Sequence, residues 1–211
     1  MYITRTANAG VLLELDGCKI LLDGVCQEVV PYLATPDSVK QMLYKTCPDL
    51  VAVTHRHEDH CDLGFEQWYC SETGKTVMCP EAGKAYCQCN GVSITAVPSR
   101  HIGKQDCSHV SYIIEGSSCI WFMGDAAPAQ WKNRTDLPKP DVLIAPYAYA
   151  NTSASWSLVQ SLAPQAVILL HLPPLENDIY GLNQAVMQTV EQEHNISVFI
   201  PKLEEKLKLN V

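Results

Sequence analysis

The sequence predicts a single domain of mixed α/β structure, on the basis of three observations. Its 211 residues suit one domain that covers 1–211. Hydrophobic residues make up 47% and charged residues 18%, a composition that can bury a substantial core. Short apolar, β-branched runs alternate along the chain with segments that carry a helical pattern. We therefore expect strands and helices to combine in one domain, without a linker.

The N-terminal half is expected to contain short strands, helices and one long loop. Strands are predicted at Tyr2–Thr6, Val11–Leu15, Lys19–Leu22, Leu50–Thr54, Thr76–Cys79 and Val92–Val97. Helices are predicted at Pro36–Lys45, Asp62–Tyr69 and Glu81–Tyr86. Thr35 is expected to be the N-cap of the first helix, because Thr before Pro is typical of a helix start. The segment Val25–Thr35 is expected to be a loop that flanks the entrance to a site.

The C-terminal half repeats this alternation. Strands are predicted at Ser108–Ile114, Cys119–Met123, Asp141–Ala145, Ala166–Leu170 and Ser197–Ile200, and helices at Ser153–Leu162 and Leu182–His194. Pro164 ends the first of these helices, since proline cannot continue the backbone hydrogen bonds.

The stretch His-Arg-His-Glu-Asp-His, from His55 to His60, carries the most chemistry. It directly follows the predicted strand Leu50–Thr54. In an extended segment His55 and His57 point to the same side, whereas Asp59 and His60 follow a turn and can face a second ion. Imidazole and carboxylate ligands suit zinc, and less specifically manganese or iron. The alternative is a polar surface loop. With 7 His in 211 residues, such clustering arises by chance in under about one per cent of such chains.

This stretch resembles the H-x-H-x-D-H motif of the metallo-β-lactamase superfamily. The resemblance implies a four-layer αββα sandwich with a metal site at one edge, between the two sheets. It also implies a set of ligands for two ions. The first ion would be held by His55, His57 and His101, the second by Asp59, His60 and His171, and Asp125 would bridge both.

The ligand positions outside the motif follow predicted strand ends, where the superfamily places such residues. His101 is expected to be the third ligand of the first ion. His109 is its rival, but it lies in a predicted strand and is expected to be structural. Asp125 follows Gly124 after an apolar strand and resembles the superfamily's Gly-Asp element. His171 ends a buried strand and matches the last ligand of the second ion.

Other residues are expected to support the site. Asp23 is expected to orient a ligand histidine by a hydrogen bond, with a plain turn aspartate as the alternative. Loop residues that could line a substrate pocket are Asn8, Tyr147, Tyr149 and Asn151. No thiol is expected to bind the ions, although Cys61 directly follows His60. Cys87 and Cys89 form the one close pair and give only a weak indication of a redox or metal role.

The resemblance implies a binuclear hydrolase with two divalent ions, most readily Zn²⁺, with Mn²⁺ or Fe as alternatives. Such ions acidify water for attack on a carbonyl or phosphoryl centre, with Asp59 and Asp125 as the catalytic residues. Diiron oxygen-reducing relatives usually carry glutamate at position 57, so His57 favours the hydrolytic branch. The layout resembles the group of L-ascorbate-6-phosphate lactonase, which implies a small-molecule ester, lactone or phosphoester. Two alternatives stay open: a mononuclear iron oxygenase of the persulfide dioxygenase type, and a non-catalytic metal-bound partner protein.

Charge and hydropathy restrict the partners. The net charge of -8 argues against binding to a phosphate backbone, so no nucleic acid is expected. No apolar stretch approaches the ~20 residues that span a bilayer, and no signal peptide is recognisable, so no membrane contact and a cytoplasmic location are expected. The oligomeric state is left open.

Overall fold

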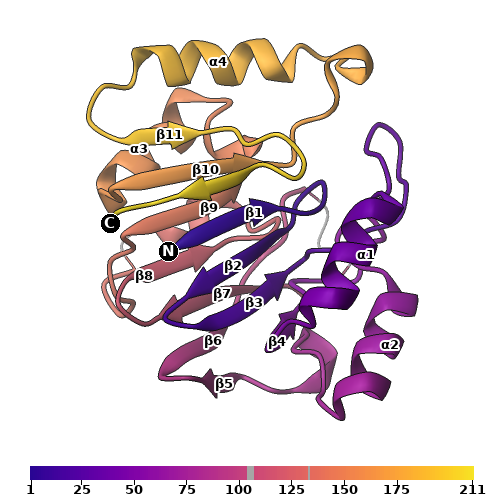
Figure 1. The fold of residues 1–211 in the computed structure, drawn as a ribbon. Helices are drawn as coiled ribbons and strands as arrows, with labels where there is room; N and C mark the ends of the chain where they lie inside the picture. Colours follow the sequence, from indigo (N-terminus) through magenta and orange to yellow (C-terminus); the bar gives the residue numbers. More distant parts are fainter. Residues whose placement is uncertain (104–106, 133) are drawn as a thin grey trace.

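Two β-sheets and four α-helices make up the described residues, 1–103, 107–132 and 134–211, of a computed structural model (Figure 1). The first sheet has the strand order β12-β1-β2-β3-β4, and the second has the order β11-β10-β9-β8-β7-β6-β5. The strands are β1 Tyr2–Arg5, β2 Val11–Leu15, β3 Cys18–Leu22, β4 Leu50–Ala52, β5 Tyr86–Cys89, β6 Val92–Pro98, β7 Val110–Glu115, β8 Cys119–Phe122, β9 Val142–Pro146, β10 Ala166–Leu170, β11 Ser197–Phe199 and β12 Lys206–Lys208. The α-helices are α1 Asp37–Thr46, α2 Leu63–Thr73, α3 Ser153–Leu162 and α4 Leu182–Gln192, and the 3₁₀-helices are η1 Pro80–Ala82, η2 Pro128–Trp131, η3 Tyr147–Tyr149 and η4 Leu175–Asn177.

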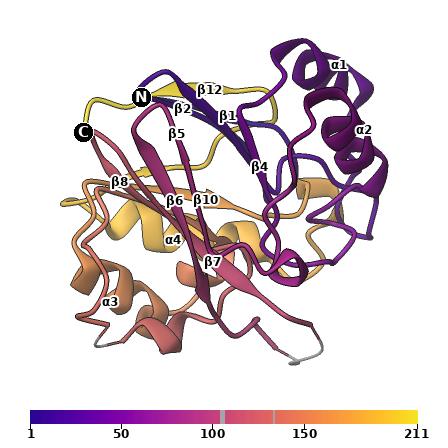
Figure 2. The ribbon, with the colours of Figure 1, turned by 90° about the horizontal axis from the view of Figure 1, so that it is seen from below.

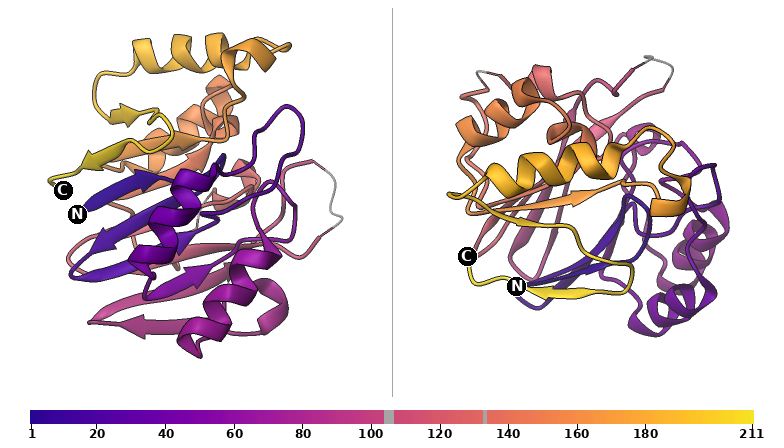
Figure 3. Two further views of the ribbon diagram at one scale, coloured as in Figure 1. Left: turned by 45° about the vertical axis from the view of Figure 1, so that its right-hand side comes forward. Right: turned by 90° about the horizontal axis from the view of Figure 1, so that it is seen from above.

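Three clusters of buried side chains define the layers. One cluster, which includes Leu13 and Ile144, lies between the two sheets. A second contains Leu43 of α1 and Phe65 of α2 and covers the outer face of the first sheet. The third contains Trp156 of α3 and covers the outer face of the second sheet. Figures 2 and 3 show α1 and α2 on one side of the sheets and α3 and α4 on the other. The predicted αββα sandwich is confirmed.

Side chains cap two of the helices, whereas the cap predicted for α1 is absent. Asp62 caps α2 by accepting a hydrogen bond from Phe65 N at 3.0 Å, and Thr152 caps α3. Thr35 was expected to cap α1, and this prediction is wrong. The helix begins at Asp37, and the Thr35 hydroxyl accepts instead from Cys26 N at 2.9 Å. That bond closes the loop before α1.

The region after α2 also differs from the prediction. The expected strand Thr76–Cys79 is reduced to an isolated bridge between Met78 and Ala52. The expected helix Glu81–Tyr86 is wrong, because β5 begins at Tyr86 and pairs antiparallel with β6. Asn90 and Gly91 both have positive φ and form the turn of this hairpin, a geometry that Asn-Gly favours. This turn signal was overlooked.

The strand ends bring the predicted ligands together. Strands β6, β8 and β10 run in the same direction, so their carboxyl ends meet at one edge of the second sheet. His101, Asp125 and His171 follow these three ends. The motif that begins at His55 follows the end of β4 in the first sheet. Within the described ranges, no helix is long and apolar enough to cross a membrane.

Candidate metal centre

All seven predicted ligands lie close together at this edge. Their ligand atoms fall into overlapping groups, and the atoms of each group lie within 4.8 Å of one another. The first group is His55, His57 and His101, the second group is Asp59, His60 and His171, and His55, His60 and Asp125 form a set that overlaps both. Four sequence segments that are far apart in the chain thus converge on one site.

The first group surrounds the Nε2 atom of His55. This atom lies 3.0 Å from Nδ1 of His57, and the ring of His101 lies 4.7 Å from the ring of His55, centroid to centroid. Burial, together with the neighbouring His60, lowers the pKa of His55, so this ring is neutral. Its Nδ1 lies 3.0 Å from the Thr54 hydroxyl, whose own proton goes to Asp23. His55 therefore donates through Nδ1 and keeps a lone pair on Nε2, as a metal ligand requires.

The second group is organised by two imidazole Nε2 atoms, those of His60 and His171, which lie 3.1 Å apart. Oδ2 of Asp59 lies 3.2 Å from Nε2 of His171. Nδ1 of His60 lies 2.9 Å from Oδ2 of Asp23, which is fully buried. Asp23 therefore orients His60, the contact that the sequence suggested, and turns Nε2 of His60 into the site.

Asp125 lies between the two groups. Its Oδ2 is 3.5 Å from Nε2 of His101 in the first group, and also 3.5 Å from Nε2 of both His60 and His171 in the second. Burial raises the pKa of Asp125, but His171 and His60 outweigh it and hold the pKa well below its usual range. The carboxylate is therefore ionised, as a bridging ligand would be.

The donor set fits divalent metal ions. Two atoms bound at about 2.0–2.1 Å to one tetrahedral zinc would stand about 3.3 Å apart, and the separations at this site run from 3.0 to 3.9 Å. Oδ1 of Asp125 is buried and has no hydrogen-bond partner in the described part of the chain. Such an atom is costly unless a ligand satisfies it. Both observations match a site built for cations.

His109 supports Asp125 rather than facing the ions. Its Nε2 accepts a hydrogen bond from the backbone N–H of Asp125 at 3.0 Å, and its Nδ1 lies 2.8 Å from the Ser99 hydroxyl. Ser99 in turn contacts Ser111, whose hydroxyl donates to the Met123 carbonyl. Burial lowers the pKa of His109 to about 3, so the ring is neutral and both its nitrogens are engaged. His109 lies just before β7, not inside the strand as predicted.

His109→Ala is expected to lower metal affinity by about 10–100-fold although all seven predicted ligands remain, because the Asp125 backbone loses its partner. His109→Gln, whose amide oxygen can accept from the same N–H, should recover part of the loss. Titration of metal against a competing chelator measures both. Unchanged affinity in His109→Ala, or an anomalous peak on His109, would contradict this role.

Two residues at the site have a left-handed backbone. His171 has φ +62, in the left-handed region that β-carbons disfavour, and Gly124 has φ +51 beside Asp125. A β-carbon on Gly124 would lie 2.5 Å from Oγ1 of Thr54, the hydroxyl that also bonds Asp23. Glycine therefore lets the Asp125 loop approach the metal motif.

Gly124→Ala is expected to destabilise the protein by about 2–4 kcal/mol, from the left-handed φ and the clash with Thr54. Chemical denaturation measures this free energy. Gly74→Ala is the control, because its φ is +67 but no atom lies within 4 Å of the added carbon. Equal losses in the two variants would show that the contact with Thr54 contributes nothing.

The predicted pocket walls are only partly supported. Asn8 lies beside the site, with its amide nitrogen 3.4 Å from Nδ1 of His171, and the ring of Tyr147 lies 6.4 Å from the His171 ring. Tyr149 is fully buried and donates to the Ala126 carbonyl, so it lines no pocket. Sequence reasoning missed Tyr32, whose ring meets His171 edge-on at 4.4 Å. Only its place in the predicted entrance loop could have suggested it.

Among the described residues, no thiol belongs to the ligand groups of the candidate metal centre. Cys61 donates to the His57 carbonyl at 3.5 Å, and burial raises its pKa. A separate group, Cys18, Asp49 and Cys89, brings its ligand atoms within 4.8 Å of one another. It lies at the opposite ends of β3 and β4 from the metal motif.

Known proteins with a similar sequence or fold are described as metal enzymes. The chain is 26% identical to the UPF0173 metal-dependent hydrolase MK1542 of Methanopyrus kandleri, over 84% of this chain and 88% of that protein. A possible metal-dependent hydrolase from Veillonella parvula has the same fold, with a TM-score of 0.71, 17% identity and 99% of each chain covered. CmlA, a diiron β-hydroxylase from Streptomyces venezuelae, aligns with a TM-score of 0.66 and 13% identity, over 99% of this chain and 54% of that one. Such low identities establish the fold alone.

A family match covers most of the chain. Residues 2–171 match the family described as "Beta-lactamase superfamily domain". This range contains both sheets' central strands and every residue of the candidate metal centre. The protein therefore belongs to the β-lactamase superfamily domain family.

Proposed function

We propose that the protein is a metal-dependent hydrolase that uses two divalent ions, Zn²⁺ in the first place, with Mn²⁺ or Fe as alternatives. The first ion is assigned to one group of ligands and the second to the other, with one shared carboxylate. The assignment is His55, His57 and His101 for the first, Asp59, His60 and His171 for the second, and Asp125 for both.

One observation carries this proposal. The Oδ2 atom of Asp125 lies 3.5 Å from imidazole nitrogens that belong to both groups. A single carboxylate in that position can neutralise two cations and keep them close together. A mononuclear site would need only one of the two groups.

Asp59 and Asp125 are the proposed catalytic residues. Burial raises the pKa of Asp59, but the contact with His171 and the charge of His60 outweigh it and lower the pKa, so the carboxylate is ionised at neutral pH. It can orient an attacking water and accept its proton. When bound, the divalent ions would supply Lewis acidity and make water a stronger acid. Asn8 can hold the His171 ring: turning its amide places the oxygen at Nδ1, so that Nε2 is left for the ion.

The proposed substrate is a small-molecule ester, lactone or phosphoester, in keeping with the resemblance to the L-ascorbate-6-phosphate lactonase group. The net charge of -8 supports a small molecule over a nucleic acid. A cytoplasmic location is part of the same proposal. The sequence relative MK1542, which is named a metal-dependent hydrolase, supports hydrolysis over oxygenation.

Metal content and activity test the proposal together. Elemental analysis and anomalous scattering of protein loaded with Zn²⁺, Mn²⁺ or Fe should give two ions per chain. A panel of esters, lactones and phosphodiesters should then show turnover that depends on metal. His171→Ala should lose the second ion, whereas His194→Ala, an exposed histidine outside the site, is the matched control.

Two outcomes would reject the function. One iron per chain with consumption of oxygen would indicate an oxygenase of the persulfide dioxygenase type. Full loading with two ions but no turnover across the panel would favour a non-catalytic metal-bound partner protein.

A further inference from the structure

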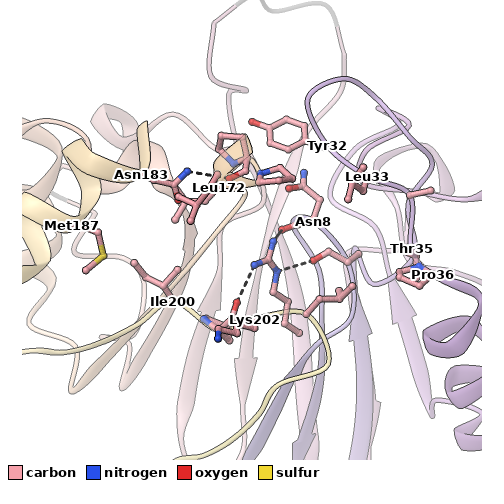
Figure 4. A pocket seen from close by; sticks show the side chains of 18 of the residues that line it. Asn8, Tyr32, Leu33, Thr35, Pro36, Leu172, Asn183, Met187, Ile200 and Lys202 are labelled. Atoms are coloured by element: carbon pink, nitrogen blue, oxygen red, sulfur yellow. Dashed lines mark hydrogen bonds between the residues drawn. The ribbon is translucent and has the colours of Figure 1, made fainter. Parts of the chain in front are cut away.

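A groove of about 800 Å³, whose lining Figure 4 shows, adjoins the metal centre on the His171 side. It lies between the loop that precedes α1 and helix α4, and Tyr32, Leu33 and Met187 line its sides. This volume is within the range of ligand sites in proteins, roughly 300–1,000 Å³. The groove is therefore large enough for a substantial part of a substrate.

Three lining residues connect the groove to the candidate ligand His171. The Asn8 amide lies 3.4 Å from Nδ1 of His171, and the Asn8 carbonyl accepts from the His171 backbone N–H. The Tyr32 ring meets the His171 ring edge-on at 4.4 Å, and Leu172 is the next residue in the chain. A molecule that lies in the groove thus ends beside the second group of ligands.

The walls of the groove are mainly aliphatic. Two of these apolar side chains are open to solvent, because Met187 on α4 is 44% exposed and Leu33 is 59% exposed. Val198 and Ile200 continue the same wall beyond β10. Apolar side chains left open in a groove gain free energy when a ligand covers them. The chemistry of these walls selects an apolar group.

The charged residues in the lining are all cations. They are Arg5 and Lys202, in a chain with a net charge of -8. The Arg5 guanidinium donates to the carbonyls of Ala7, Asn8 and Pro201, and no ion pair among the described residues includes it. These bonds use three of its five N–H groups and fix the guanidinium in place. Its charge is therefore available to an anionic ligand.

We propose that this groove binds the apolar tail of an amphiphilic anionic substrate, with the acidic group near Arg5 and the scissile bond at the metal centre. This inference rests on the proposed hydrolase function. It narrows the substrate class to esters or lactones that combine an alkyl or aryl chain with a carboxylate or phosphate. Purely polar small substrates would leave the aliphatic walls uncovered.

A series of simple amphiphiles tests the inference by calorimetry. Butanoate, hexanoate and octanoate are titrated into the full-length protein, both metal-loaded and after treatment with a chelator, so that groove binding is separated from binding to the ions. Affinity is expected to rise about fourfold for each added methylene. Octanoate should bind at least about tenfold more tightly than octylammonium, with octanol between them, because the lining carries only positive charge.

Variants of lining residues test whether octanoate binds in this groove. Met187→Glu adds a carboxylate to the wall and should weaken octanoate about tenfold, whereas Gln188→Glu adds the same charge to an exposed position outside the lining and should change nothing. Arg5→Met should reduce the preference for octanoate over octanol. If this variant does not fold, Lys202→Gln tests the second cation of the lining. Lys208→Gln, at an exposed position outside the lining, is its control.

The inference and the proposed function fail in different ways. Affinity independent of chain length, or equal binding of the three head groups, would overturn the inference even if two ions and hydrolysis are found. Light scattering that shows a dimer dissociated by Met187→Glu, with no octanoate binding, would overturn it in favour of an interface between copies of this chain. If octanoate binds as expected but the protein shows no turnover, the assignment of the groove stands and the proposed hydrolase function is rejected.

Discussion

Asp125→Asn is expected to lose one metal ion and to reduce turnover by about 10²–10³-fold, while the fold survives. The substitution keeps the shape of the side chain and removes its charge. Asp125 approaches imidazole nitrogens of both ligand groups at 3.5 Å, whereas each other candidate ligand serves one group in the proposed assignment. Without its charge two cations would repel each other with less compensation, so one should leave. A fixed charge at a reaction centre typically contributes a factor of this size.

The effect is measured by metal stoichiometry, circular dichroism and activity of Asp125→Asn, and His171→Ala is measured in parallel. The His171 variant should keep the first ion, because the first ligand group is intact. Asp37→Asn, at an exposed position in the first turn of α1, controls for the loss of one negative charge. Two ions bound and near-normal turnover in Asp125→Asn would refute the bridging role.

The ligand groups could be predicted because each residue depends on a local signal. His55, His57, Asp59 and His60 follow a short apolar strand, and each later residue follows the end of another strand. The resemblance to the metallo-β-lactamase superfamily grouped these residues into one site, and the parallel strands of the second sheet bring their carboxyl ends to one edge. The αββα layers were implied by the same resemblance.

The supporting contacts could not be predicted, because they join residues that no local pattern connects. Nε2 of His109 meets the backbone of Asp125 across 16 residues, and the Asn8 amide meets His171 across 163. The groove is formed by side chains from both ends of the chain, such as Arg5 and Lys202. Strand β12 was missed because its three residues, Lys206–Lys208, are mostly charged and pair with β1 only in the folded chain.

Asp23→Asn is expected to lower the affinity for the second ion by about 100-fold, although it removes no ligand. The Asp23 carboxylate accepts from the Thr54 backbone N–H at 2.7 Å, from the Thr54 hydroxyl at 2.6 Å and from Nδ1 of His60 at 2.9 Å. An asparagine has one oxygen and one amino group, so it cannot accept all three. If its amino group faces His60, that ring must accept through Nδ1 and carry its proton on Nε2. This is the nitrogen that faces Asp125 and His171, and a protonated nitrogen cannot bind a metal.

The loss of affinity should exceed the loss of stability. Each buried donor left without an acceptor costs about 1–3 kcal/mol, so the free energy of unfolding of the metal-free protein should fall by about that amount. Chelator competition measures the affinity, and denaturation of the metal-free protein measures the stability. Nitrogen-15 NMR of the histidine rings should show His60 with its proton moved from Nδ1 to Nε2, which a purely structural defect would not produce. Asp37→Asn should leave all three readouts unchanged. Two ions held with undiminished affinity in Asp23→Asn would show that Asp23 does not set the tautomer of His60, and that the second ligand group orients itself without this carboxylate.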